Sequence, residues 1–259
     1  ESLMHRYHRL GELPKKRHMA LRKPDGGVYY EELKGNKGFV GPSSLLYHLH
    51  RPTAVVGTKL LREVQLDEDP DRQLRMRHFF TNKLARGGSP TMDRVPMLFN
   101  NDVTLWMAFP DKEDDFYYRN AQGDEIVYVS DGSGTLETAF GELVYNQGDY
   151  LVIPRGILHR YRLGKGEQRF FITESKGEVR TPKRYRNEYG QLIERSPFSE
   201  RDWRVPENLI TVDKQEPTPI IVKQRDQLTE VTLDHHPCDV IGWDGYYYPY
   251  AFSIHDFEP

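Results

Sequence analysis

Two segments of this chain indicate its fold: Glu125-Ile-Val-Tyr-Val-Ser-Asp-Gly132 and, further along, Gly148-Asp-Tyr-Leu-Val-Ile-Pro154-Arg-Gly156-Ile-Leu-His159. The first segment places six residues between a carboxylate and a glycine. The second places five residues between a glycine and a Pro-x-Gly turn, and two more before a histidine. Both are short β-forming runs bounded by Gly or Pro, which is typical of strands joined by tight turns.

These two spacings, one after the other, resemble the paired motifs of the cupin superfamily. In metal-binding cupins, the resemblance implies, a His-x-His pair stands just before the glutamate. Here residues 116–124 contain no histidine. The two positions fall on Tyr118 and Asn120 or, with a shifted spacing, on Arg119 and Ala121.

The ligand set that remains is therefore one carboxylate and one imidazole. Catalytic Fe(II) is usually held by two histidines and one carboxylate. We therefore expect Glu125 and His159 to be vestigial ligand positions that bind no metal.

The composition of the chain argues against several classes of function. The chain has 259 residues, a net charge of -3 and a pI near 6.4, which give no electrostatic case for nucleic acid or an anionic membrane. No apolar run is long enough to span a bilayer, and the first residues lack the apolar stretch of a secretory signal. The single cysteine, Cys238, rules out an internal disulfide framework and suits a reducing compartment, so we expect a cytoplasmic protein.

Short strand-like runs bounded by Gly, Pro, Asp or Asn fill residues 123–175, and no long helix is convincing. The predicted fold is all-β: a cupin-type jelly-roll barrel with additional strands and long surface loops. We expect residues 1–99 to form a β-rich segment packed on the barrel and residues 100–175 to form a degenerate cupin barrel. Residues 176–259 would form a surface excursion and return strands.

Other residues that could bind a metal or act in catalysis are better explained by structural roles. His48-Leu-His50 has a metal-like spacing, but no glutamate follows it, and a single buried cysteine in His235-His-Pro-Cys238 behaves as a small hydrophobe. Ser43-Ser44 lacks the context of a hydrolase nucleophile, and Gly132-Ser-Gly134 is a hairpin turn without a following helix. The aromatic run Tyr246–Tyr250 is interpreted as packing.

Several separate short motifs along the chain resemble those of the homogentisate 1,2-dioxygenase family. They include Pro14-Lys-Lys-Arg-His18, Ser43-Ser-Leu-Leu-Tyr-His48, Arg51-Pro-Thr, Gly242-Trp-Asp-Gly, Pro249-Tyr-Ala-Phe and Asp256-Phe-Glu-Pro. The resemblance implies a two-cupin protein in which Fe(II) and O₂ open the aromatic ring of homogentisate. It also implies that the iron ligands lie in a C-terminal cupin beyond Pro259, so that none can be assigned in this chain, and the catalytic residues stay unknown.

The resemblance further implies that the stretch around residue 118 is a loop that carries an aromatic side chain to a neighbouring subunit's active site. Here Arg119 stands where relatives often have tyrosine, with Tyr118 beside it. An arginine there would contact a substrate carboxylate through a charge-assisted hydrogen bond. A surface salt bridge is an equally good explanation.

The sequence thus predicts the N-terminal portion of an Fe(II)-dependent, extradiol-type dioxygenase that opens homogentisate or a similar hydroxylated aromatic acid with O₂. We expect a homo-oligomer, a trimer or dimer of trimers. One alternative is a non-catalytic degenerate cupin that serves oligomerisation or small-ligand binding. Another is a different cupin enzyme, such as an isomerase, that uses Glu125, His159 and a third ligand.

Overall fold

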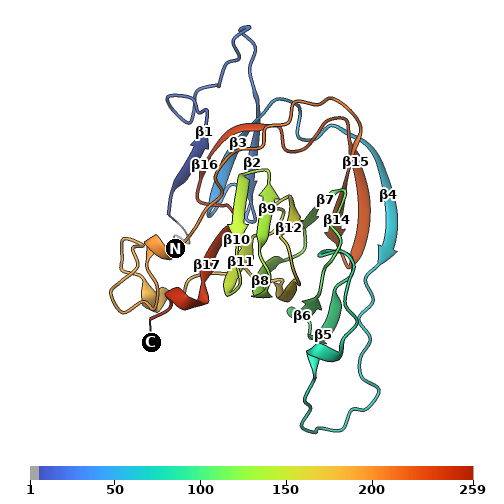
Figure 1. Cartoon of the computed structure of the whole chain (residues 1–259). Helices are drawn as coiled ribbons and strands as arrows, with labels where there is room; N and C mark the ends of the chain where they lie inside the picture. Colours follow the sequence, from blue (N-terminus) through green and yellow to red (C-terminus); the bar gives the residue numbers. More distant parts are fainter. Residues whose placement is uncertain (1–5, 259) are drawn as a thin grey trace.

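The computed structural model describes residues 6–258, and Pro259, beyond which we expect a further cupin, lies outside them. The described chain consists of strands in three sheets, and its only helices are single 3-10 turns (Figure 1). These turns are η1 (Thr81–Lys83), η2 (Lys183–Tyr185), η3 (Glu200–Asp202) and η4 (Ile254–Asp256). None of the helices in residues 6–258 has the length and apolar character of a membrane span. The predicted all-β class is confirmed.

One six-stranded antiparallel sheet carries the first motif. In spatial order it contains β17 (Tyr250–Ser253), β11 (Asp149–Ile153), β8 (Asp124–Asp131), β13 (Arg169–Ser175), β6 (Val103–Ala108) and β5 (Val95–Phe99). Residues of β8 alternate between the interior and the outer face, so Glu125, Val127 and Val129 all point inward. Because the side-chain period is two, this register fixes which groups enter the core.

A seven-stranded sheet faces the first. It contains β10 (Gly141–Tyr145), β9 (Gly134–Thr138), β12 (His159–Leu163), β7 (Tyr117–Asn120), β14 (Thr218–Gln224), β15 (Gln227–Leu233) and β4 (Val55–Glu63). All neighbours are antiparallel except β14 and β7, which run parallel. Gly132, in the turn between β8 and β9, has a φ of 102°, and a Cβ there would lie 2.4 Å from Gln168 Oε1. Glycine is therefore required at this turn.

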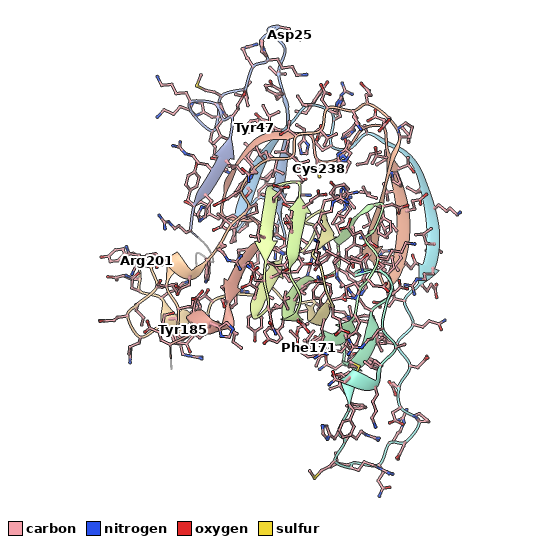
Figure 2. All side chains as sticks on the ribbon, viewed as in Figure 1. Asp25, Tyr47, Phe171, Tyr185, Arg201 and Cys238 are labelled. Carbon is pink, nitrogen blue, oxygen red and sulfur yellow. The ribbon has the colours of Figure 1, made fainter. Side chains whose placement is uncertain are left out.

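A third sheet lies at the upper left of Figure 1 and contains β1 (His8–Gly11), β16 (Val240–Gly245), β3 (Ser43–His48) and β2 (Tyr30–Gly35). Trp243 of β16 anchors it to the rest of the molecule. Its indole N–H donates to the Phe140 carbonyl at 2.8 Å, and the two rings meet edge to face at 4.9 Å. The turn beyond β1 ends at Asp25, at the outer tip of the molecule (Figure 2).

The main core fills the space between the six- and seven-stranded sheets. Its buried residues come from both inner faces and include Val127, Leu136, Leu151, Tyr161 and Phe170. Removal of such aromatic and aliphatic side chains from water is the dominant favourable term in folding. The predicted cupin-type fold with additional strands is confirmed.

The two sheets do not close into a hydrogen-bonded barrel. The backbone between residues 204 and 207 spans one open side, since Arg204 N donates to the Ala251 carbonyl at 2.8 Å and Glu207 pairs with Glu142 on the opposite edge. This part of the long excursion between β13 and β14 thus covers sheet edges that would otherwise expose unpaired groups. Figure 2 shows Tyr185 and Arg201 in that excursion, beside the sandwich.

Candidate functional site

Glu125 and His159 face the same interior from opposite sheets. Glu125 lies on β8 and His159 on β12, and both side chains are fully buried, at 0 % exposure. His159 is paired across the backbone with Tyr118 of β7. The Pro-x-Gly turn of the second motif, with Gly156 at a φ of 81°, carries the chain from β11 in the six-stranded sheet to β12 in the seven-stranded sheet.

The positions of the missing histidines are occupied by Tyr118 and Asn120. The Tyr118 hydroxyl donates to Glu125 Oε2 at 3.3 Å, and Asn120 Nδ2 donates to the same oxygen at 3.0 Å. Of the two spacings that the sequence left open, the structure therefore directs the first pair toward the carboxylate.

The site contains a residue that sequence reasoning missed. Arg94 precedes β5, and its Nη1 lies 2.8 Å from Glu125 Oε1, with the arginine side chain only 6 % exposed. The pair is held by charge rather than by an aligned hydrogen bond. Arg94 Nε donates to the Pro90 carbonyl at 2.9 Å, and its guanidinium lies 5.7 Å from the centre of the Tyr118 ring. No sequence motif identifies an arginine in a loop as a site residue. The contact of Arg94 with Glu125 is visible only in the folded chain.

Charge balance in the site follows from this pair. Burial by itself raises the pKa of Glu125, but the Arg94 charge, the hydrogen bond from Asn120 and other nearby groups together outweigh it and hold the pKa at about 2. Burial lowers the pKa of His159, so its imidazole is neutral. Its Nδ1 lies 2.8 Å from the Ile157 carbonyl, which fixes the proton on Nδ1 and leaves Nε2 as the acceptor. Within residues 6–258, His159 Nε2 and Arg94 Nη2 have no hydrogen-bond partner.

These residues do not fit a catalytic metal. The carboxylate of Glu125 already contacts a guanidinium cation, and the groups beside it are a phenol and an amide. A single imidazole, that of His159, completes the set, whereas Fe(II) oxygenases use two histidines and a carboxylate. Within the described part of the chain, no group of three or more His, Cys, Asp or Glu could hold a metal ion. Arg94 instead supplies the positive charge that a metal would supply.

A small cavity of about 120 Å³ lies next to Arg94 and Tyr118. Trp106 and Lys223 line it as well, and both bind the buried carboxylate of Glu174. Lys223 Nζ lies 2.6 Å from Glu174 Oε2, and the Trp106 indole N–H donates to that oxygen at 3.2 Å. Here too, buried charges are paired within the chain, as burial in a medium of low dielectric constant requires.

The sequence-based expectation of an outward-reaching loop at residues 116–122 is wrong for Tyr118. Residues Tyr117–Asn120 form strand β7, and Tyr118 is only 2 % exposed because β7 is hydrogen-bonded between β12 and β14. Its neighbour Arg119 points to the opposite face, as alternation along a strand demands. Arg119 lines a larger pocket of about 350 Å³.

The other candidates have structural roles. Burial by itself lowers the pKa of His48, but hydrogen bonds to Asp239 and Glu32 raise it to about 9, with His48 Nδ1 2.6 Å from Asp239 and Nε2 3.0 Å from Glu32. His50 lies apart from it and contacts Asp213 at 3.0 Å.

Burial raises the pKa of the Cys238 thiol to about 12, so it is not a nucleophile. Ser44 Oγ donates to the Tyr247 carbonyl, which ties β3 to the segment after β16. In the aromatic run after β16, Tyr247, Tyr248 and Tyr250 are buried, as packing predicts.

Comparison with known proteins gives a consistent picture. The family model for the N-terminal domain of homogentisate 1,2-dioxygenase matches residues 99–254. A protein of Saccharolobus solfataricus named "Putative dioxygenase" is 41 % identical over 254 residues, which are 98 % of this chain and 65 % of that protein. The homogentisate 1,2-dioxygenase of Bradyrhizobium diazoefficiens is 32 % identical over 151 residues, 56 % of this chain and 31 % of that enzyme. The chain thus spans less than two thirds of the length of these relatives.

Solved structures with partial similarity include a cupin-2 domain protein from Shewanella frigidimarina. It is 21 % identical with a TM-score of 0.29, and the match covers 32 % of this chain and 80 % of that one. A second structure is that of a Ralstonia eutropha protein named as a mannose-6-phosphate isomerase, which is also 21 % identical with a TM-score of 0.35. That match covers 39 % of this chain and 100 % of that one. These two matches carry no argument about function.

Proposed function

We propose that this chain, which belongs to the family defined by the N-terminal domain of homogentisate 1,2-dioxygenase, is the metal-free half of a ring-cleaving dioxygenase. In that role it shapes and stabilises the enzyme, and the chemistry takes place in a second cupin. The substrate class we propose is homogentisate or a similar hydroxylated aromatic acid, with O₂ as the second substrate. The dioxygenase names of the relatives support this class.

The observation that carries the proposal is the Arg94–Glu125 ion pair. It lies where a metal-binding cupin would hold its ion, and it is supported by Tyr118 and Asn120. A guanidinium cannot exchange ligands or bind O₂, so this centre serves stability. We accordingly propose that iron dependence of the whole enzyme comes from ligands outside this chain.

Arg119 remains our proposed contact to a substrate carboxylate at a neighbouring subunit's site. Tyr118 is not retained in this role, because its hydroxyl is committed to Glu125 inside the chain. A homo-oligomer, as a trimer or dimer of trimers, is proposed with it. Exposed apolar side chains support association: Leu60 and Leu61 on edge strand β4, and Leu74 and Met76 on the extended segment that follows β4, which projects away from the sandwich in Figure 1.

A cytoplasmic location is part of the same proposal. Its support is the absence of a disulfide framework, since the single cysteine, Cys238, is buried and free.

The second candidate function is a non-catalytic module for oligomerisation or small-ligand binding. The internal Arg94–Glu125 ion pair favours it for the chain taken alone. The two functions differ in whether the longer protein consumes O₂.

The test is oxygen uptake with homogentisate and Fe(II), measured on residues 1–259 and on the full-length protein. We expect uptake by the full-length protein and none by residues 1–259. Uptake by residues 1–259 at a comparable rate would place the active site in this chain. A full-length protein that binds iron and leaves homogentisate and related hydroxylated aromatic acids unchanged would favour the non-catalytic module.

A further inference from the structure

A pocket of about 350 Å³ lies between the seven-stranded sheet and the N-terminal sheet, separate from the interior that holds Glu125. Its walls are largely apolar and include Leu46, Phe140, Ile220 and Leu233. These residues come from β3, the turn after β9, β14 and β15. Pockets of this size and lining are typical of small-molecule sites, in which a few polar groups orient the ligand.

Arg119 is the polar group that has no partner in this pocket. Its side chain is half-buried, yet within residues 6–258 it forms no hydrogen bond, ion pair or ring contact. Burial lowers the pKa of Arg119, and the charge of Glu32 opposes this effect. An arginine stays protonated in proteins, so an unpaired guanidinium in an apolar pocket bears a desolvation cost that an anion would offset.

The other charged groups of the pocket are already matched. Glu32 contacts Lys34 Nζ at 2.5 Å and His48 Nε2 at 3.0 Å, and His48 Nδ1 contacts Asp239 at 2.6 Å. His235, which also lines the pocket, contacts Asp234 at 2.6 Å. Among the described residues, Arg119 is therefore the charged side chain of the lining that lacks a partner.

We propose that this pocket binds an organic monoanion, a carboxylate attached to a small apolar body, and that Arg119 holds the carboxylate. The guanidinium offers two parallel N–H donors that match the two oxygens of a carboxylate. A single unmatched charge and apolar walls suit a monocarboxylate better than a phosphate dianion. The apolar body would lie against Ile220 and Leu233.

This inference does not depend on ring cleavage, since the pocket belongs to one chain and needs no iron. It gives Arg119 a ligand within its own chain, as the alternative to contact with a neighbouring subunit's substrate. Binding to residues 1–259 alone, without metal, therefore tests it separately from the proposed dioxygenase function.

The experiment is titration calorimetry of the metal-free chain with phenylacetate and with its uncharged analogue, phenylacetamide. We expect one phenylacetate per chain and binding of phenylacetamide weaker by about tenfold or more, because a hydrogen bond to a charged group contributes at least this factor. Arg119→Gln should weaken phenylacetate binding by a similar factor and leave phenylacetamide unchanged. Arg72→Gln, at an exposed arginine distant in sequence, is the matched control and should bind as the unmodified chain does.

No binding of phenylacetate, or equal affinity for acid and amide, would overturn the proposal. Equal phenylacetate affinity in the Arg119→Gln chain, with an unchanged circular dichroism spectrum, would also overturn it. If Arg119→Gln does not fold, the comparison of acid with amide on the unmodified chain still decides the matter.

Discussion

Arg94 and Glu125 form a buried ion pair, with 2.8 Å between Nη1 and Oε1, at the centre of a cupin sandwich that lacks two of the usual metal ligands. The pair joins an irregular segment before β5 to the middle of the six-stranded sheet. It ties that segment to the interior and places a permanent positive charge beside Glu125. The consequences for stability and for metal binding can be measured.

Arg94→Met is expected to destabilise the chain by about 3–5 kcal/mol, because it leaves the Glu125 carboxylate buried without its cation. Arg94→Met/Glu125→Leu should recover much of that loss, since both charges are then absent. Urea unfolding gives both values. Arg72→Met, which disrupts an exposed pair with Glu68, is the control and should change stability little. A loss no larger than the control's would show that the buried pair is unimportant.

We predict that Glu125 and His159 bind no metal. After anaerobic incubation with Fe(II) or Co(II) and gel filtration, the metal content should be the same in the unmodified chain and in His159→Ala. Stoichiometric metal that disappears in His159→Ala would contradict the ion-pair interpretation.

Removing the arginine and restoring the histidines should create the missing site. Arg94→Ala/Tyr118→His/Asn120→His would surround Glu125 with three imidazoles, counting His159, and is expected to bind Co(II) and to show a melting temperature that rises with metal concentration. Arg94→Ala alone is the matched control and should show no such rise. A triple variant that folds but ignores metal would mean that the side chains cannot converge on one ion.

The raised pKa of His48 leads us to expect a loss of stability at alkaline pH. Its folded pKa is about 9, against about 6.5 for an unperturbed histidine, so its contribution is complete below about pH 6.5 and disappears as pH rises through 9. The slope is at most about 1.4 kcal/mol per pH unit in that window. Urea unfolding between pH 6 and pH 10 should show the loss in the unmodified chain and a flatter profile in His48→Gln. Parallel profiles would exclude His48 as the cause.

Leu74 and Met76 are expected to lie at a subunit interface. They are 99 % and 101 % exposed in the single chain, which is unusual for two neighbouring large apolar side chains. Leu74→Glu/Met76→Glu should reduce the sedimentation coefficient of the full-length protein without lowering its unfolding midpoint as a monomer. Val28→Glu, at an exposed valine in the segment between β1 and β2, is the control. An unmodified protein that sediments as a monomer would remove the case for an interface.

The inward direction of Glu125 and His159 could be predicted from the sequence because it is a local property. Each residue lies in a strand whose alternation and flanking glycines define which side faces the core. The absence of histidine from residues 116–124 is equally local, so the incomplete ligand set was visible before folding. Nothing similar marks Arg94, because its segment has no periodic pattern that would assign it to the interior.

Strand periodicity and turn residues act over a few residues, so the sequence alone predicts an all-β, cupin-type chain with one carboxylate and one imidazole at the ligand positions. Which side chains contact these two groups depends on the tertiary structure. Arg94 reaches Glu125 from 31 positions earlier in the chain, and β7 turns Tyr118 inward and Arg119 toward a pocket formed with the N-terminal sheet. Which charges are neutralised and which are left for a ligand depends on such long-range contacts, and these are fixed by how the sheets pack rather than by local spacing.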